Sequence, residues 1–375
     1  MKIAVTIARI LVGSLFIFSG LVKAIDPLGL SYKMQEFFEV WAGDGYFPAL
    51  MNYLHGQSLW FSITMIVLEI VAGIALLIGW KKNLVVWFLF MLTLFFTFLT
   101  AFVLFTGKIR ACGCFGDCIP LTPIQTFTKD IILTLLIIFL IIYKKHIRPL
   151  FTNTAGTVII LLSITGATFL QLYVLKQLPL KDCLPYKKGN NILELRKMPA
   201  GAIPDKYEYI FVYGKNGEKK EFNTTNLPDS SWKFSERKQK LVTAGVNNIP
   251  AINDFSLTDS SGVDVTEAIL GQQGDYYLFF LQNLNNGVTR WSAAFSDLSQ
   301  KARQENRPIF IITSDKETVN EFFNITNSYN IPILTSDATA IKTAARANPT
   351  LFVMKGPVVQ EKYSWADIGK AIRSF

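Results

Sequence analysis

Long apolar runs occupy the first half of the chain, whereas the second half alternates short apolar and polar stretches. A helix crosses a bilayer with about 20 mostly apolar residues. Five segments before residue 178 reach or approach this length, and we expect each to be a transmembrane helix. They are residues 3–24, 59–80, 84–106, 128–143 and 155–176. The first carries Arg9 and lacks a small-x-small cleavage site, so we expect a retained helix and not a signal peptide.

The basic residues next to these segments predict how the chain is oriented. Lys81 and Lys82 follow the second segment, residues 144–148 follow the fourth, and Lys2 precedes the first, whereas the loop 25–58 mixes acids with bases. Lysine and arginine concentrate in cytoplasmic loops. We therefore expect a cytoplasmic N-terminus and a C-terminal half on the extracytoplasmic side. Lys108 and Arg110, in a loop predicted to lie outside, are a minor exception.

The net charge of +9 changes this interpretation little. Many of the lysines and arginines flank the apolar segments instead of forming one patch, so the charge favours membrane anchoring over nucleic-acid binding. Residues 30–41 show apolar residues at helical spacing. They predict either an interfacial helix over the outer end of the bundle or a short helix packed into a lid, and the sequence leaves both open.

All four cysteines fall on segments predicted to lie outside. Cys112, Cys114 and Cys118 are in the loop between the third and fourth spans, and Cys183 follows the fifth. Three hypotheses compete: a thiol–disulfide relay in which all four are catalytic, purely structural disulfides, and a four-thiolate metal site. The C-x-C-x3-C spacing is not a standard zinc pattern, and a Cys-Gly-Cys disulfide would close a small strained ring that is easily reduced. The balance therefore tilts towards redox chemistry, with no metal expected and the pairing of the cysteines open.

Charged residues within or beside the apolar segments are candidate supporting groups. Arg9 and Glu69 lie inside predicted spans, where charges are costly and usually paired or functional. Lys23 and Asp26 form a second polar cluster at the outer end of the first span. Asp130 lies near the start of the fourth span, where it can tune a thiol or, as we expect, cap the N-terminus of the helix.

Residues 1–178 resemble the DoxX-like membrane family, and within it the branch close to the methylamine-utilisation protein MauE. The matching residues are Arg9-x3-Gly13-x2-Phe16-x2-Ser19-Gly20-x2-Lys23-x2-Asp26-Pro27-x-Gly29, then Glu69-x3-Gly73-x5-Gly79, Cys112-Gly113-Cys114-Phe115-Gly116 and Asp130. The resemblance implies a helical bundle related to membrane thiol oxidoreductases, a role in disulfide formation or maturation of exported partners, and a quinone as electron acceptor. It also implies a bacterial inner membrane with the C-terminal half in the periplasm.

The segment 179–245 predicts a small β-rich linker domain. Residues 207–213 and 219–222 alternate apolar and polar side chains and flank an Asn-Gly turn at Asn216, so they predict a hairpin.

From residue 246 to 375, short apolar runs alternate with helical patterns, which predicts an α/β domain. Runs at 276–281, 308–312 and 331–334 are expected strands. The Pro-x4-Phe-x-Leu entry beginning at Pro250, the strand pair and the Pro-Thr step at Pro349 make this part similar to a thioredoxin-like domain. The resemblance implies that Pro349 follows a cis peptide bond.

This domain departs from the thioredoxin pattern where the chemistry would be. The segment 282–291, which follows the first strand, holds no cysteine. The domain therefore cannot run dithiol chemistry alone, and we expect it to dock a partner or to cover the membrane-side cysteines. Trp291, Asn286 and Pro349 are the candidate docking residues.

Together these patterns predict a transmembrane bundle of about five helices joined to an extracytoplasmic α/β thioredoxin-like domain with a β-rich insert. The expected function is a membrane-bound thiol–disulfide oxidoreductase acting on exported partners. The alternative is a non-enzymatic membrane anchor or assembly component, in which structural disulfides support a partner-docking domain.

Overall fold

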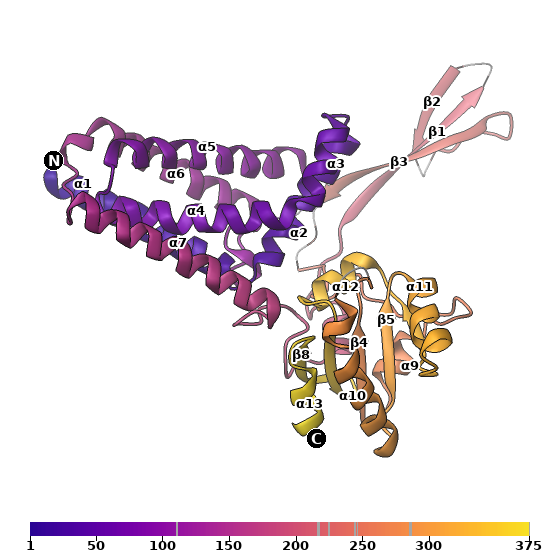
Figure 1. Cartoon of the computed structure of the whole chain (residues 1–375). Coiled ribbons are helices and arrows are strands. Elements are labelled where there is room, and N and C mark those ends of the chain that lie inside the picture. Colours follow the sequence, from indigo (N-terminus) through magenta and orange to yellow (C-terminus); the bar gives the residue numbers. More distant parts are fainter. Residues whose placement is uncertain are drawn as a thin grey trace.

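Five long helices form one elongated bundle at the N-terminal end of the chain (Figure 1). The computed structural model describes residues 1–109, 112–215, 218–223, 226–243, 245, 247–284 and 287–374, without the side chains of residues 240, 241 and 374. The bundle helices are α1 (Lys2–Ala24), α4 (Ser58–Ile78), α5 (Lys82–Thr106), α6 (Pro123–Ile142) and α7 (Asn153–Lys176). Among the described residues these are the helices long and apolar enough to cross a membrane. The chain is therefore a membrane protein with five candidate spans, as the sequence predicted.

Helix α6 begins five residues before the predicted start, and its first turn explains why. The side chain of Thr122 accepts a hydrogen bond from the Gln125 backbone N–H, and the side chain of Gln125 accepts one from the Thr122 backbone N–H. This capping box, with Pro123 in the first helical turn, fixes the start of the helix. Asp130 consequently lies two turns inside α6, so the prediction that it caps the helix was wrong.

Glycines allow α1 and α4 to approach closely. A Cβ atom on Gly73 would lie 2.7 Å from the carbonyl oxygen of Gly13, and one on Gly20 would lie 2.5 Å from the side chain of Ile70. Small residues at such crossings let helix backbones pack tightly inside a membrane. The close packing brings polar side chains of α1 and α4 together further along the same pair of helices.

Two shorter helices, α2 (Pro27–Gly43) and α3 (Pro48–Gly56), cover the end of the bundle at which α1 finishes. Asp26 caps α2 by accepting a hydrogen bond from the backbone N–H of Gly29, and α2 contains the helix expected at residues 30–41. Ser62 of α4 donates a hydrogen bond to the carbonyl of Pro27, which holds α2 against the bundle. Helix α3 was not predicted, and none of its described side chains is buried.

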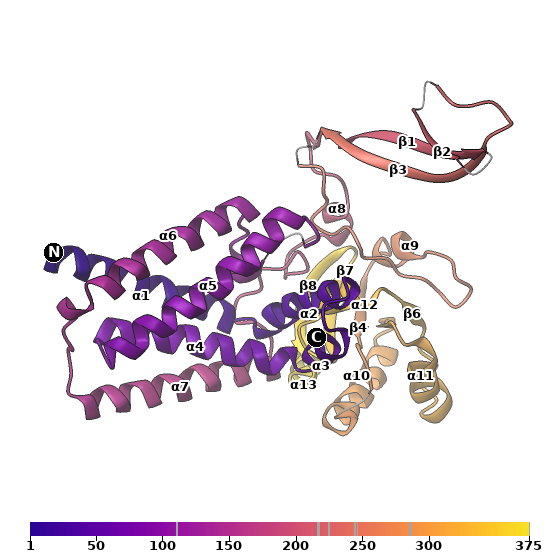
Figure 2. The same ribbon diagram turned by 90° about the horizontal axis from the view of Figure 1, so that it is seen from above.

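A three-stranded antiparallel sheet projects from the rest of the molecule as an arm (Figures 1 and 2). Its strand order is β2 (Glu218–Asn223), β1 (Lys206–Lys215), β3 (Lys233–Thr243). The predicted hairpin is confirmed in β1 and β2, while its turn at Asn216 lies outside the described residues. Strand β3 was missed because its charged sequence, KFSERKQKLVT, hides the alternation expected of a strand.

The C-terminal region is a mixed α/β unit built on a second sheet, with strand order β6-β5-β4-β7-β8. Strands β4, β5 and β6 run parallel, and β7 and β8 are antiparallel to their neighbours. The strands are β4 (Asp275–Phe280), β5 (Ile309–Thr313), β6 (Ile333–Thr335), β7 (Thr350–Lys355) and β8 (Val358–Ser364). The helices are α8 (Ile192–Leu195), α9 (Thr266–Leu270), α10 (Ser292–Gln304), α11 (Lys316–Asn320), α12 (Ala338–Ala344) and α13 (Ile368–Ser374).

Two hydrophobic clusters pack against opposite faces of this sheet. Phe279 points to one face, where it meets Trp291 and Phe295, whereas Leu278 and Phe280 point to the other. This follows from the alternation of side chains along a strand that is covered on both faces. Helix α11 runs directly into a π-helical turn, Glu321–Thr326.

Candidate dithiol site at the end of the bundle

The four cysteines form one disulfide and one pair of free thiols. Cys118 and Cys183 are joined by a disulfide with a Cα–Cα distance of 4.9 Å, which ties the cysteine loop to the segment after α7. Cys112 and Cys114 are free, with their sulfur atoms 3.3 Å apart. The pairing that the sequence left open is therefore one disulfide and one dithiol. A metal site with four thiolate ligands would need all four cysteines, and the disulfide leaves two.

The cysteine loop is held in place by contacts with α1 and with α2. Ser19 of α1 donates a hydrogen bond to the carbonyl oxygen of Cys114 at 3.1 Å. Gly113 has a φ of +71°, which favours glycine, and a Cβ atom there would lie 3.1 Å from the side chain of Lys33. Phe37 of α2 packs in the same apolar cluster as the two thiols. As a result Cys112 and Cys114 are only 9% and 8% exposed.

One buried and one partly buried ion pair lie beside this dithiol. The ammonium of Lys23 is 2.5 Å from Oε1 of Glu69, joining α1 to α4. Within α6, Lys129 lies 2.5 Å from Asp130, which also accepts a hydrogen bond from Thr100 at 3.1 Å. Of the supporting residues predicted, Lys23, Glu69 and Asp130 therefore gather at one place. They line a small cavity of about 20 Å³ together with Leu15, Phe16, Ser19, Thr93, Phe96, Cys114, Lys129 and Leu133.

The surroundings make the two thiols unequal. The hydrogen bond between the sulfurs and the positive charges of Lys129 and Lys23 lower the pKa of Cys114 below its ordinary value, against the opposing effect of burial. The same hydrogen bond, together with burial, raises the pKa of Cys112 well above its ordinary value. A thiolate is the reactive form of cysteine, and Cys114 is the thiol of the pair that ionises more readily.

Arg9 lies apart from the dithiol and has a structural explanation. Its guanidinium donates hydrogen bonds to the backbone carbonyls of Leu76 at 2.8 Å, Arg148 at 2.9 Å and Leu77. The C-terminal carbonyls of a helix lack partners within the helix. Arg9 therefore caps α4 and ties it to the α6–α7 connection, and Glu69 takes Lys23 as its partner instead.

Lys23 and Asp26 were predicted to form one polar cluster, but Asp26 instead pairs with Arg346. Its Nε atom lies 2.8 Å from a carboxylate oxygen of Asp26, and its Nη2 atom lies 2.7 Å from Asp117 in the cysteine loop. Arg346 is 5% exposed and belongs to the segment between α12 and β7. One guanidinium thus connects the α/β region, the start of α2 and the loop that carries the cysteines.

Further contacts extend this interface between the α/β region and α2. The Gln282 side chain, directly beyond β4, donates a hydrogen bond to the hydroxyl of Tyr32 at 3.4 Å. Lys342 of α12 donates one to Gln35 at 3.2 Å. Helix α2 therefore lies between the dithiol on one side and the α/β region on the other.

The three residues predicted to dock a partner are in different situations. Trp291 is 3% exposed and stacks in the core with Phe323, so its ring does not face outwards. Asn286 lies outside the described residues. The peptide bond between Asn348 and Pro349 is cis, as the resemblance implied, and this segment adjoins Arg346 at the contact with the membrane helices.

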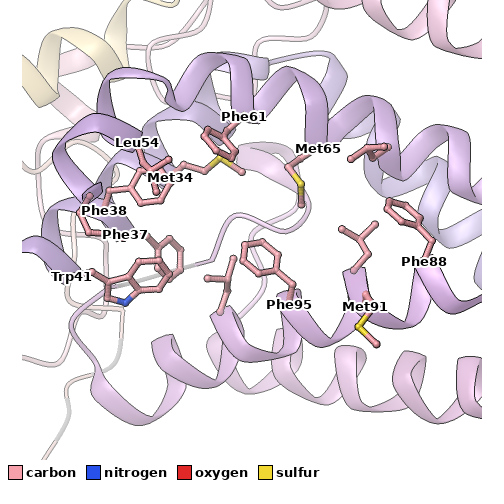
Figure 3. Close-up of a pocket in the computed structure, with 14 residues that line it drawn as sticks. Met34, Phe37, Phe38, Trp41, Leu54, Phe61, Met65, Phe88, Met91 and Phe95 are labelled. Carbon is pink, nitrogen blue, oxygen red and sulfur yellow. The ribbon is translucent and has the colours of Figure 1, made fainter. Parts of the chain in front are cut away.

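A large cavity is lined by apolar side chains of the bundle and of the helices that cover its end (Figure 3). Its volume is about 450 Å³, and it lies among α2, α3, α4 and α5. Phe37 and Leu99 line it and also pack in the cluster that holds Cys112 and Cys114. The other lining residues are Met34, Phe38, Trp41, Met51, Leu54, Phe61, Met65, Leu68, Phe88, Met91, Leu92 and Phe95. The sequence did not reveal this cavity because its lining is spread over four helices that read as ordinary apolar segments.

The described residues thus form a membrane protein with five candidate spans that carries a buried dithiol and a disulfide at one end of its helix bundle. Residues 1–143 match the family described as methylamine utilisation protein MauE, which confirms the resemblance for that part of the chain. Residues 207–244, which contain most of the β1–β3 arm, match a domain of unknown function, DUF8463. Neither match includes the α/β region.

A curated relative extends the comparison. The chain is 30% identical over 186 residues to "Protein TlpB" of Flavobacterium psychrophilum, which covers 49% of this chain and 45% of TlpB. The chain thus spans about half the length of the curated relative that it matches.

Proposed function

We propose that this protein is a membrane-bound thiol–disulfide oxidoreductase-like protein that exchanges disulfides with exported partners through Cys112 and Cys114. The observation that supports this most strongly is the geometry of the pair. Two free thiols lie 3.3 Å apart, and the hydrogen bond between them, together with the positive charges of Lys129 and Lys23, lowers the pKa of Cys114. Cys118 and Cys183 then hold the loop in place and take no direct part in exchange.

The exchange follows from the inequality of the thiols. In one direction the Cys114 thiolate attacks a sulfur of a partner disulfide, the other partner sulfur leaves as a thiolate, and a mixed disulfide forms. Cys112 then attacks the Cys114 sulfur and releases the second partner thiol. The net change is one partner disulfide reduced and one Cys112–Cys114 disulfide formed. The reverse sequence forms a disulfide in the partner and returns the dithiol.

Repeated disulfide formation in partners needs an acceptor of two electrons and two protons, which the family resemblance gives as a quinone. The 450 Å³ cavity fits the apolar tail of such a molecule, because its lining is aromatic and aliphatic, and it shares Phe37 and Leu99 with the thiol cluster. A bound quinone would supply the electron sink. The residues of this chain would position it against the cysteine loop and exclude water.

The α/β region resembles a thioredoxin-like domain in its strand order and in the cis bond before β7. We propose domains at 1–178, 179–245 and 246–375, with the last covering the membrane-side thiols. Tyr186 and Ile192 of the middle segment pack in the core of this last domain. Gln282 occupies the position after β4 where the resemblance expects a reactive cysteine, and it contacts Tyr32 of α2. The face that thioredoxin-like domains use to bind their substrates therefore contacts α2 in this protein.

For the membrane orientation we propose a cytoplasmic N-terminus and a periplasmic C-terminal half in a bacterial inner membrane. Two contacts support the positive-inside argument. Lys82 donates a hydrogen bond to the carbonyl of Ile147, and Arg9 donates one to the carbonyl of Arg148. The two basic loops therefore lie at the same end of the bundle, opposite the cysteines.

The alternative is a non-enzymatic membrane anchor or assembly component. It is favoured by the burial of the dithiol and by the extent to which the α/β region is fastened to the membrane half. Besides the Arg346 contacts, Lys362 of β8 lies 2.6 Å from Asp182, next to the Cys118–Cys183 bridge. In this case the cysteines stabilise a platform and exchange no disulfides.

Reaction with the small uncharged disulfide 4,4′-dithiodipyridine separates the two functions. Purified protein with the native disulfide intact should release two pyridinethiones per chain and form a Cys112–Cys114 disulfide. Cys112→Ser should release one and retain a mixed disulfide on Cys114. Cys114→Ser should react more slowly, because burial still raises the pKa of Cys112 when Cys114 is gone. Two stable mixed adducts on the unsubstituted protein, without an internal disulfide, would refute the exchange function.

A further inference from the structure

The small cavity beside Cys114 contains two polar atoms whose hydrogen-bonding capacity is unused. Oε2 of Glu69 and Oγ1 of Thr93 are buried and find no hydrogen-bond partner among the described residues. Both residues line this cavity, and so does Cys114. A buried polar group without a partner costs about 1–3 kcal/mol, and more if it is charged. Such groups in native proteins are therefore usually satisfied by ordered water.

The size of the cavity fits that solution. Its volume of about 20 Å³ is enough for one water molecule, which needs roughly 10–15 Å³. A buried water makes about three hydrogen bonds, so the cavity must also offer about three polar partners. Glu69, Thr93 and Cys114 supply three candidate partners from α4, α5 and the cysteine loop.

We propose that a buried water in this cavity links Cys114 to Glu69 and Thr93, and that Glu69 accepts the thiol proton when Cys114 ionises. The proposal rests on Cys114 being the nucleophile of the proposed function. In the step, the S–H bond of Cys114 breaks, a proton moves through the water, and an O–H bond forms at Oε2 of Glu69. No electron is transferred, and the thiolate remains on Cys114.

The charges around the site fit this role. Lys23 engages Oε1 of Glu69 at 2.5 Å, which leaves Oε2 as the atom that can receive a proton. The other ionisable groups facing Cys114 are Cys112, Lys129 and Asp130. Moving the proton from Cys114 to Glu69 leaves the net charge of the buried site unchanged. The transfer thus avoids the large cost of adding a charge to a region of low dielectric constant.

The pH dependence of alkylation tests this route. In a Cys112→Ser background, which keeps a hydrogen-bond donor next to Cys114, the rate of reaction with iodoacetamide is measured between pH 6 and about 8.5. Thiolate that forms by internal transfer gives a rate nearly independent of pH. With Glu69→Gln added, the proton must go to bulk water, so the rate should rise about tenfold per pH unit below the thiol pKa.

Three further variants make the result specific. Thr93→Val keeps the side-chain shape but removes a water ligand, and should also give a steep profile. Glu36→Gln, which changes a carboxylate paired with Lys33 on the other side of the loop, should leave the profile flat. If Glu69→Gln alone does not fold, Lys23→Gln with Glu69→Gln removes both charges and should give the steep profile.

Equal slopes with and without Glu69, whether flat or steep, would overturn the proposal. This outcome is distinguishable from failure of the proposed function, because alkylation of a single thiol requires no disulfide exchange. A flat profile that becomes steep with Glu69→Gln would support the proton route even in a protein that gave no Cys112–Cys114 disulfide with dithiodipyridine.

Discussion

Replacing Arg346 with alanine tests whether the α/β region keeps the dithiol covered. The guanidinium is 5% exposed and makes ion pairs at 2.8 Å with Asp26 and 2.7 Å with Asp117. Breaking a buried pair by removing one partner costs about 3–5 kcal/mol. Solvent reduces this value here, because the side chains of Asp26 and Asp117 are 20% and 40% exposed. We expect the docking of the α/β region to lose about 2 kcal/mol, or about a 30-fold change in its equilibrium.

The consequence should appear at the thiols, because α2 lies between them and the α/β region. Lys33 and Phe37 of α2 contact the cysteine loop, while Tyr32 contacts Gln282. If the α/β region opens and closes rapidly and maleimide reaches the thiols only in the open state, the labelling rate is proportional to the open population. The rate at which maleimide labels Cys112 and Cys114 should then rise about 30-fold in Arg346→Ala.

A matched control is Arg290→Ala. Arg290 is exposed and lies 5.7 Å from the ring of Trp365, within the α/β region, so its removal should leave labelling unchanged. Both proteins are compared in lipid nanodiscs with the Cys118–Cys183 disulfide intact. Equal labelling rates in Arg346→Ala and the unsubstituted protein would show that the α/β region does not cover the thiols.

Three further changes probe separate parts of the structure. Cys183→Ser opens a disulfide that spans 65 residues and should destabilise the folded chain by about 4 kcal/mol, measured by thermal unfolding; an unchanged transition contradicts this. Arg9→Met removes a cap from three carbonyls and should destabilise the bundle by about 2–4 kcal/mol, whereas the exposed Lys2→Met should not. Hydrogen bonds from Gly245 and Tyr207 lower the pKa of Asp205 below 3.8. These hydrogen bonds therefore stabilise the arm fully above pH 3.8, and the stabilisation is lost as the pH falls through the lower pKa that Asp205 has in the folded protein. Amide exchange in β1 should become faster over this pH range in the native protein but not in Asp205→Asn.

The hydrophobic pattern predicted the large elements well, since a spanning helix and a half-buried strand each impose a period or length on the sequence. All five spans, the β1–β2 hairpin and the alternation of strands and helices after residue 246 were expected on these grounds. The start of α6 was also readable, because the Thr-Pro-x-Gln capping box is a local signal. Because this box starts α6 at Pro123, Asp130 lies too far into the helix to cap it.

The site depended on information that no local pattern contains. The distribution of four cysteines between a bridge and a dithiol is set by the positions of the loops in space. Glu69 has Lys23 and not Arg9 as its partner because α1 and α4 cross at glycines that place Lys23 level with it. The Arg346 contacts join residues more than 200 positions apart, so they follow only from the docking of folded parts.

The central claim is that Cys112 and Cys114 cycle between dithiol and disulfide while Cys118 and Cys183 remain joined. The direct measurement is the redox state of each cysteine in native membranes, quenched with acid, alkylated with a mass tag and read by mass spectrometry, before and after mild oxidation and reduction. We predict that Cys112 and Cys114 change together between two tags and none, while the Cys118–Cys183 bridge stays untagged throughout. A Cys112–Cys114 pair that keeps both tags after oxidation would contradict the account.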